Sequence, residues 1–338
     1  MRLPARDDMS DTMNAMVFHR PETPLQHERV PIPEPEPDEL LIRIRACGVC
    51  RTDLHIIDGE LNEPAIPVIP GHQIVGTVET DPSGEWPPGQ RVGVPWLGGT
   101  CGHCEFCRAR QENLCPEARF TGYNRDGGFA EYTTAHKQFC FPLPENQSPE
   151  EQAPLLCAGL IGYRAWRFCG ENVRNLGLYG FGAAAHILTQ IATPSGQRVH
   201  AFTRPGDTES QNFASEKGAV WAGGSDQAPP EPLDAAIIFA PVGALVPEAL
   251  SRLKPGGHLV LGGIHMSDIP SMPYRLLWEE RRVQSVANLT RRDGIEFFEL
   301  LKDRPVETDI HPYPLSEANQ ALEDLRSGNF TGAAVLTP

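Results

Sequence analysis

Four cysteines lie within fifteen residues and form the spacing C-x2-C-x2-C-x7-C, at Cys101, Cys104, Cys107 and Cys115. Thiolates with this spacing can surround one tetrahedral zinc ion at about 2.3 Å per bond. Disulfides and an iron-sulfur cluster are the alternatives, but usual cluster spacings such as C-x2-C-x2-C-x3-C-P differ from this one. Four thiolates leave no open coordination position, so we expect this zinc site to hold a loop in shape and the chemistry to lie elsewhere.

A second motif lies where a predicted strand runs directly into a predicted helix. The run LYGFGAAAHILTQIA contains Gly180, Gly182, Ala183 and Ala185, a G-x-G-x-x-A turn. In this context the turn lets the backbone approach a pyrophosphate at the start of the helix. The motif therefore predicts a dinucleotide site, and the alternative is a tight turn with a purely structural role.

The next predicted strand, RVHAFTR, ends in Thr203 and Arg204. A site selective for NAD would place Asp or Glu here, and that acid would repel a 2′-phosphate. Arg204 can instead pair with such a phosphate and Thr203 can donate a hydrogen bond to it. The pair predicts a preference for NADP(H) over NAD(H), unless Arg204 simply points to solvent.

Composition narrows the class of protein. The chain has 338 residues, enough for about two domains, and its 44 acidic and 29 basic side chains give a net charge of −15. We therefore expect neither nucleic acid nor a membrane surface as a partner. Residues 1–15 lack the apolar core of a signal peptide. Nine cysteines without an export signal predict a cytoplasmic protein with metal ligands instead of disulfides. We expect residues 1–12 to form a frayed tail.

The character of the chain changes near residue 150. Up to residue 144 the segments are short, β-rich and interrupted by proline and glycine, as in LLIRIRACG at 40–48 and QIVGTVE at 73–79. From residue 175 onward, apolar strands alternate with helical stretches. The fold class predicted is α/β, with an irregular β-rich domain followed by a doubly wound parallel sheet of the Rossmann type.

Several segments together resemble one known family. They are CGVCRTDLH at 47–55, PGHQIVG at 70–76, GYNRDGGFAEY at 122–132, LLCAGLIGYRAW at 155–166 and the glycine-rich turn. In this order they resemble the zinc-dependent alcohol dehydrogenases of the medium-chain dehydrogenase/reductase superfamily, over nearly the whole chain. The run LYGFGAAAH is most similar to the NADP-preferring bacterial branch near the cinnamyl alcohol dehydrogenases. The resemblance implies a GroES-like catalytic domain over 1–150, rejoined by 290–338, and a Rossmann domain over 151–289.

The resemblance also implies a second, catalytic zinc, and therefore two ions per chain. Cys50, His72 and Cys157 match its ligand positions and leave the fourth position open for water or substrate. Asp53 matches a carboxylate that holds the His72 ring. The remaining cysteines match no ligand position and are expected to be inert packing residues: Cys47, Cys140 and Cys169.

The activity implied is hydride transfer between a zinc-bound primary alcohol or aldehyde and C4 of the nicotinamide. Thr52 and His55 match the positions of a proton relay that runs from the hydroxyl through the nicotinamide ribose to the imidazole and solvent. An imidazole can both accept and donate a proton, which suits this task. Other matched positions comprise Arg51 for the pyrophosphate; Gly263, Ile264 and Leu289 beside the nicotinamide; and Trp96 and Ile161, with Leu97 or Tyr123, in an apolar substrate pocket.

One residue departs from the family pattern. The family usually has glutamate after the ligand histidine, whereas this chain has Gln73. The amide keeps an oxygen lone pair but loses the charge, so we expect a tuned zinc site. The alternatives are a zinc-dependent reductase of another carbonyl or an enone, and a non-catalytic nucleotide-binding zinc protein. As partners we expect a small alcohol or aldehyde and a second copy of the chain, in a homodimer or homotetramer.

Overall fold

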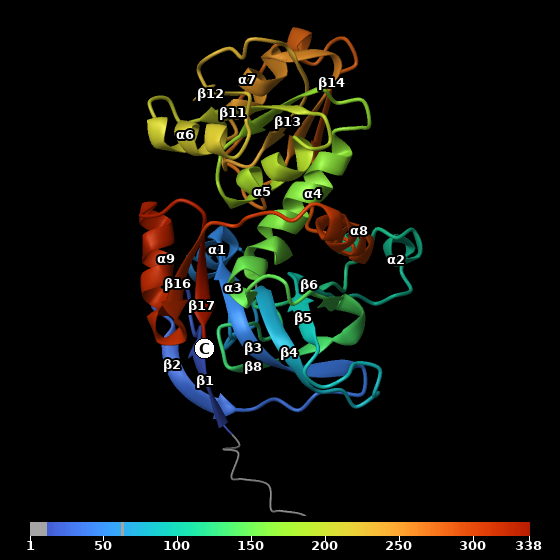
Figure 1. Ribbon diagram of the computed structural model, residues 1–338, viewed down its shortest axis with the longest axis vertical. Coiled ribbons are helices and arrows are strands. Elements are labelled where there is room, and N and C mark those ends of the chain that lie inside the picture. Colours follow the sequence, from blue (N-terminus) through green and yellow to red (C-terminus); the bar gives the residue numbers. More distant parts are fainter. Residues whose placement is uncertain (1–11, 62–63) are drawn as a thin grey trace, which may run out of the picture.

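The computed structural model describes residues 12–61 and 64–338. The expected frayed tail therefore lies outside the described residues, apart from Thr12, which opens the first strand. Two large sheets build the molecule, one in its lower and one in its upper half as drawn in Figure 1. The first has the strand order β16-β17-β3-β4-β5-β9, with β8 also paired to β3, and the second has the order β12-β11-β10-β13-β14-β15.

The strands are β1 (Thr12–Val17), β2 (Gln26–Pro31), β3 (Glu39–Val49), β4 (Gln73–Thr80), β5 (Arg91–Val94), β6 (Leu97–Gly99), β7 (Arg119–Phe120), β8 (Tyr132–His136), β9 (Phe141–Pro142), β10 (Asn175–Tyr179), β11 (Arg198–Thr203), β12 (Trp221–Gly224), β13 (Leu233–Ile238), β14 (Leu253–Leu261), β15 (Arg282–Ser285), β16 (Ile310–Pro314) and β17 (Ala333–Thr337). The helices are α1 (Arg51–Ile57), α2 (Glu105–Arg108), α3 (Pro149–Gln152), α4 (Ala158–Phe168), α5 (Ala183–Ala192), α6 (Thr208–Glu216), α7 (Leu245–Ser251), α8 (Arg291–Asp303) and α9 (Ala318–Ser327). Short 3-10 helices are η1 (Glu112–Leu114), η2 (Lys137–Phe139), η3 (Ala153–Leu156), η4 (Tyr274–Leu276) and η5 (Leu315–Glu317).

The first sheet is mostly antiparallel and forms because its strands alternate apolar and polar residues. Along β3, Leu40, Ile42 and Ile44 are buried while the arginines between and after them face solvent. β17, near the end of the chain, pairs antiparallel with β3. Strands near the end of the chain therefore complete the sheet that starts with β3.

The second sheet is parallel throughout. All five residues of β10 are buried, as expected of a central strand with both faces covered. Gly177 is needed in this strand because a Cβ there would come within 2.6 Å of the Leu233 side chain. The fold class predicted from the sequence, a GroES-like β-rich part with a Rossmann sheet, is confirmed.

Helix α4 runs between the two halves of the molecule (Figure 1). Two glycines on this helix allow close packing. A Cβ on Gly159 would lie 2.7 Å from the Phe297 ring of α8, and one on Gly162 would lie 3.3 Å from the Ala184 carbonyl in α5. Helix α4 therefore fixes both α5 and α8 relative to the β-rich half.

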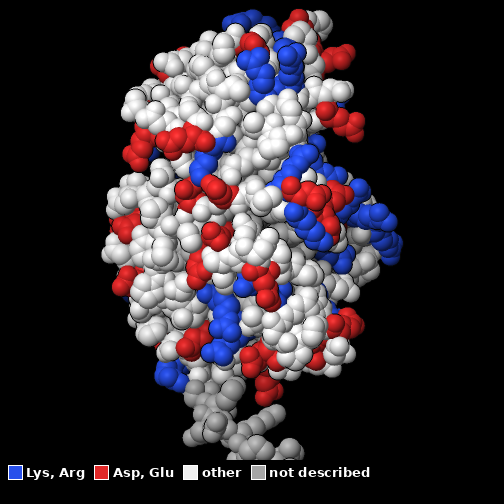
Figure 2. Space-filling view, in the orientation of Figure 1, with Lys and Arg blue, Asp and Glu red and all other residues white. Residues whose placement is uncertain are grey.

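The surface carries charges of both signs. On the face drawn in Figure 2, acidic and basic side chains are interspersed, and the basic ones gather on the right, at the height of α2 and α8 in Figure 1. In the part of the chain that the structure describes, no helix is long and apolar enough to cross a membrane.

A buried histidine makes the stability of the parallel sheet depend on pH. His186 in α5 is fully buried beside Phe213, with ring centroids 5.5 Å apart, and neither ring nitrogen has a hydrogen-bond partner among the described residues. Burial lowers the pKa of His186 to about 4 from the ordinary value of 6.5. The unfolded chain therefore takes up this proton first as the pH falls.

We predict that the free energy of unfolding falls between pH 6.5 and 4 and that His186→Phe removes up to about 3 kcal/mol of this dependence. Urea unfolding at several pH values measures it. The same substitution at the exposed His27 is the control and should leave the dependence as in the unaltered protein. A His186→Phe variant with the full acid dependence would contradict the assignment.

Candidate functional site

Three segments that are distant in the sequence bring Cys50, His72 and Cys157 together. The Cys50 sulfur lies 3.3 Å from His72 Nε2 and 4.0 Å from the Cys157 sulfur, and all three ligand atoms lie within 4.8 Å of one another. Two sulfurs bound to one tetrahedral zinc at about 2.3 Å per bond would lie about 3.8 Å apart. The donor set and its spacing therefore fit a zinc ion, and this cluster offers three ligands, not four.

Asp53 orients two of these three candidate ligands, Cys50 and His72. Its side chain is fully buried, and Oδ2 accepts a hydrogen bond of 2.8 Å from the Cys50 backbone N–H, which caps helix α1. Its other oxygen lies 3.2 Å from His72 Nδ1. This contact turns the opposite ring nitrogen, Nε2, toward the Cys50 sulfur, as a metal-binding imidazole requires.

The electrostatics of this cluster also suit a cation. A hydrogen bond from the Cys157 thiol lowers the pKa of Cys50 well below that of an ordinary thiol, against the opposing effect of burial. Burial lowers the pKa of His72, but the Asp53 carboxylate and the Cys50 thiolate outweigh it and raise that pKa to about 10. The cluster thus attracts a proton strongly at the place where a divalent ion would bind.

The four-cysteine lobe is equally well formed. Cys101 Sγ lies 3.5 Å from Cys115 Sγ and 4.0 Å from Cys107 Sγ, and all four sulfurs lie within 4.8 Å of one another. Backbone N–H groups point at the sulfurs: Cys104 N donates to Cys101 Sγ at 3.4 Å and Cys107 N to Cys104 Sγ at 3.5 Å. Such bonds stabilise thiolates, so the lobe fits a second zinc ion.

An aromatic cluster borders the His72 ring. Trp96 meets that ring at an interplanar angle of 82° and a centroid distance of 5.0 Å. Trp96 in turn contacts Phe120 at 5.2 Å and Tyr123 at 5.6 Å between centroids. Ile161 lies one turn after Cys157 in α4 and is half-buried. Leu97, by contrast, is fully buried in the core and is not available to a ligand. The sequence analysis missed Phe120, which carries no motif.

The expected relay residues share helix α1 with Cys50. The Thr52 backbone N–H donates to the Cys50 sulfur at 3.4 Å. His55 is half-buried; its Nδ1 pairs with Glu60, and its ring centroid lies 5.3 Å from that of His265, which follows β14. Glu60 and His265 are contacts that the sequence analysis missed, because no spacing rule connects them to His55.

The glycine-rich turn lies at the carboxyl edge of the parallel sheet. Gly180 has φ +87°, and a Cβ there would come within 3.0 Å of Ala240. Gly182 caps α5 without a side-chain hydrogen bond, and a Cβ there would meet nothing within 4 Å. Ala183 is half-buried and Ala185 fully buried. The free N–H groups of α5 and the open space beside Gly182 fit a pyrophosphate.

The other residues expected to bind the nucleotide differ in their exposure to solvent. Thr203 is buried, and its hydroxyl is engaged with the carbonyls of Arg204 and Gly223 at 3.1 Å and 3.4 Å. Arg204 and Ile264 are exposed, and they follow the carboxyl ends of β11 and β14. Arg51, the first residue of α1, is exposed as well. Leu289 is buried, so only its backbone is available to a nucleotide.

Three cysteines that were expected to be packing residues, and Gln73, are all buried. Burial raises the pKa of each of the cysteines Cys47, Cys140 and Cys169, which accords with packing roles. Gln73 is buried at the start of β4 and packs against Gly48, where a Cβ would come within 2.9 Å of the amide. Gly48 therefore makes room for the side chain that follows His72.

A cluster with the donors for a zinc ion, together with a glycine-rich turn at the carboxyl edge of a Rossmann sheet, is typical of an oxidoreductase. Residues 36–145 match the family model described as the alcohol dehydrogenase GroES-like domain. The chain is 45% identical to the probable alcohol dehydrogenase AdhA of Mycobacterium tuberculosis, over 96% of this chain and 97% of that one.

Two solved structures have the same fold. Acetophenone reductase from Geotrichum candidum, in complex with NAD, is 27% identical with a TM-score of 0.86 and 98% of both chains covered. A cobalt- and zinc-bound thermostable alcohol dehydrogenase from Pyrobaculum aerophilum is 25% identical with a TM-score of 0.87, over 97% of this chain and 100% of that one. The chain belongs to the zinc alcohol dehydrogenases of the medium-chain dehydrogenase/reductase superfamily. It is accordingly an oxidoreductase that acts on CH–OH groups of small molecules.

The two glycines of the turn should respond differently to the same substitution. We predict that Gly182→Ala weakens dinucleotide binding about tenfold or more, because its methyl group fills the space left for the pyrophosphate, while the melting temperature stays unchanged. Gly180→Ala should lower both the dinucleotide affinity and the melting temperature, because it strains a residue whose φ is +87°. Fluorescence titration with NADPH and thermal unfolding measure the pair. Equal dinucleotide affinity of Gly182→Ala and the unaltered protein would contradict the placement.

Proposed function

We propose that the protein is an NADP(H)-dependent zinc alcohol dehydrogenase, or aldehyde reductase in the opposite direction, for primary alcohols with apolar side chains. The observation that carries this proposal is the convergence of Cys50, His72 and Cys157 next to the glycine-rich edge. Cys157 opens α4, which packs against the first turn of α5 at Gly162. A second contact joins the zinc-ligand region to the parallel sheet, because the ring of His55 in α1 lies against that of His265, which follows β14.

Each side chain of the site has a defined task in this reaction. Cys50, His72 and Cys157 would hold the catalytic zinc, which when bound supplies a Lewis acid for the substrate oxygen. Asp53 keeps the His72 ring in place. Gln73, which follows His72, is uncharged and therefore adds no further negative charge next to the zinc ligands. Trp96 with its aromatic neighbours offers a dry wall that favours apolar substrates.

Proton transfer falls to helix α1. Thr52 would take up the proton of the substrate hydroxyl while giving its own hydroxyl proton onward toward His55. His55, which is partly exposed, would accept a proton on its free ring nitrogen and release one to solvent. Glu60 on Nδ1 of His55 fixes the ring so that the other nitrogen stays free for this exchange. Arg51 and the start of α5 would bind the two phosphates of the dinucleotide, which supplies or accepts the hydride.

We also propose two zinc ions per chain, because both thiolate clusters have the donors and the spacing for one ion each. All nine cysteines are free, which supports a cytoplasmic location. In this proposal residues 1–150 and 290–338 form the catalytic domain, and residues 151–289 form the nucleotide-binding domain, which also supplies Cys157 to the catalytic zinc site. The edge strand β15 and the exposed Tyr274 and Trp278 nearby would meet a second copy, giving a dimer or tetramer.

A substrate panel tests the proposal. We expect the zinc-replete protein to oxidise NADPH with aliphatic and aromatic aldehydes, and expect chelation of zinc to abolish turnover. Metal analysis should find two zinc ions per chain. Turnover with enones but not with simple aldehydes would move the assignment to another zinc-dependent reductase, and two bound ions without any turnover would favour a non-catalytic role.

Arg204 should determine the choice of cofactor. Since its guanidinium is the exposed cation at the end of β11, we predict that Arg204→Glu lowers the ratio of kcat/KM for NADPH over NADH by about a hundredfold, chiefly by repelling the 2′-phosphate. Steady-state kinetics with both cofactors measure the ratio. Arg51→Glu is the control, because it should weaken both cofactors alike. An unchanged ratio in Arg204→Glu would exclude Arg204 from cofactor selection.

A further inference from the structure

The chain after β15 leaves the parallel sheet at its carboxyl edge. The Val286 N–H still donates to the Leu261 carbonyl at 3.0 Å, and residues 287–291 then cross from the edge to the start of α8. We call these five residues the crossing segment. Ligands of doubly wound sheets bind at this edge, where Gly180, Gly182 and Gly263 also lie. The crossing segment therefore begins at the same edge of the sheet as the region proposed for the nucleotide.

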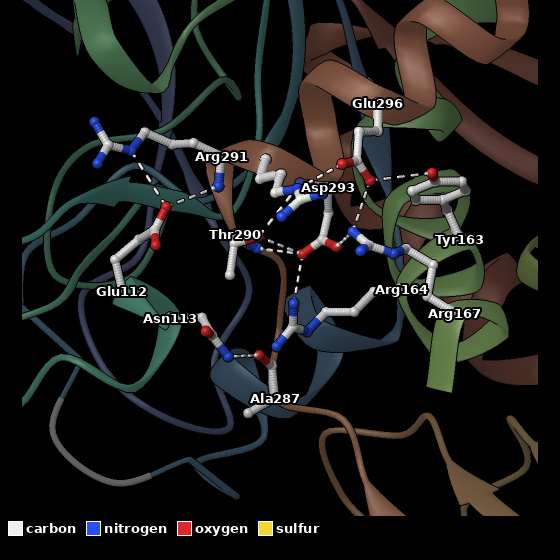
Figure 3. Close-up of polar contacts among 11 residues, drawn as sticks. Glu112, Asn113, Tyr163, Arg164, Arg167, Ala287, Thr290, Arg291, Asp293 and Glu296 are labelled. Carbon is white, nitrogen blue, oxygen red and sulfur yellow. Dashed lines mark hydrogen bonds and ion pairs between the residues drawn. The ribbon is translucent and has the colours of Figure 1, made fainter. Parts of the chain in front are cut away.

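The crossing segment receives two bonds from a distant part of the chain. Asn113 Nδ2 donates to the Ala287 carbonyl at 2.6 Å, and Glu112 Oε1 accepts from the Arg291 backbone N–H at 3.0 Å and from its Nε at 3.3 Å. Figure 3 shows both contacts reaching the segment. Asn113 and Glu112 are 7% and 4% exposed, whereas Ala287 is exposed and Arg291 half-buried, so these bonds are partly buried.

Both donor and acceptor belong to the four-cysteine lobe. Glu112 and Asn113 are the first two residues of η1. Cys115 follows η1 directly, and its backbone N–H donates to the Glu112 carbonyl at 3.1 Å. The Cys115 sulfur lies 3.5 Å from that of Cys101 at the other end of the lobe. The sulfur cluster therefore fixes η1, and η1 in turn holds the crossing segment.

A separate anchor holds the far end of the segment. Asp293 is 1% exposed; it accepts from Thr290 N and Oγ1 at 2.8 Å and 2.6 Å, and from Arg164 and Arg167 of α4 at 2.5 Å and 3.1 Å (Figure 3). This anchor ties α8 to α4 and does not reach residues 287–289. The first residues of the segment depend on the lobe instead. Asn288 there has φ +58°, a conformation that the fold must maintain.

We propose that the four-cysteine lobe positions the nucleotide-binding edge, with Asn113 and Glu112 as the positioning residues. The amide of Asn113 fixes the Ala287 carbonyl and the carboxylate of Glu112 fixes the Arg291 N–H, so that the backbone between them presents a constant surface to the dinucleotide. This inference rests on the proposed function, because it assumes that the dinucleotide binds at this edge. It gives the lobe a task in ligand binding beyond holding its own loop.

Nucleotide affinity tests the proposal, measured by fluorescence titration of the zinc-loaded protein with NADPH. We expect Asn113→Ala to raise the dissociation constant about tenfold, as for loss of one partly buried hydrogen bond. Glu112→Gln keeps an acceptor but loses the charge, and should raise it about threefold. The aldehyde KM at saturating NADPH and the zinc content should stay unchanged in both variants. Hydrogen exchange of the crossing segment should become faster in both.

The chain offers a matched control. Asn175 is 4% exposed and donates from Nδ2 to the Pro232 carbonyl at 3.2 Å, at the opposite edge of the same sheet. Asn175→Ala should lower the melting temperature as Asn113→Ala does, yet leave the dissociation constant for NADPH within twofold. Lower stability of Asn113→Ala and Glu112→Gln with unchanged NADPH affinity would overturn the inference alone. An unaltered protein that binds neither NADPH nor NADH would overturn the proposed function and this inference together.

Discussion

A fully buried carboxylate is costly unless its charge is compensated, and the catalytic cluster is arranged around one such group. Asp53 is compensated by the Cys50 backbone N–H and by the His72 ring. The first contact sets where helix α1 begins, and the second sets which ring nitrogen faces the sulfurs. Removal of Asp53 would therefore release a thiol, an imidazole and a helix start at once. Cys50, His72 and the start of α1 therefore depend on one another through the contacts of Asp53 alone.

Helix α4 extends this unit to the rest of the molecule. It begins directly after Cys157 and carries Arg164 and Arg167 two turns further on. These two guanidinium groups share the buried Asp293, so one helix links the metal cluster to the start of α8. Pairing of Asp293 with two cations avoids the penalty of a lone buried charge. Helix α4 and its two ion pairs with Asp293 thus fix the position of the two halves relative to each other.

Much of this could be predicted because the relevant signals are local. The spacing of Cys101 to Cys115, the strand-to-helix turn at Gly180 and the alternation along β3 each lie within a few residues, and the fold class followed from them. Properties that depend on packing were not accessible. The sequence does not show that the Thr203 hydroxyl bonds within the fold, that Leu97 and Leu289 are buried, or that His265 reaches His55. The contacts of Asn113 and Glu112 span 174 and 179 residues and leave no pattern at all.

The return of the chain end to the first sheet has a consequence for how such a protein can be made and can evolve. Because β17 pairs with β3, the β-rich half gains its last strands only after the whole nucleotide-binding half has been synthesised. The Rossmann sheet therefore behaves as an insertion between two parts of one unit. An insertion of this kind can be replaced by recombination at two junctions, provided that the replacement keeps Cys157 and the arginines of α4, which pair with Asp293 of the host.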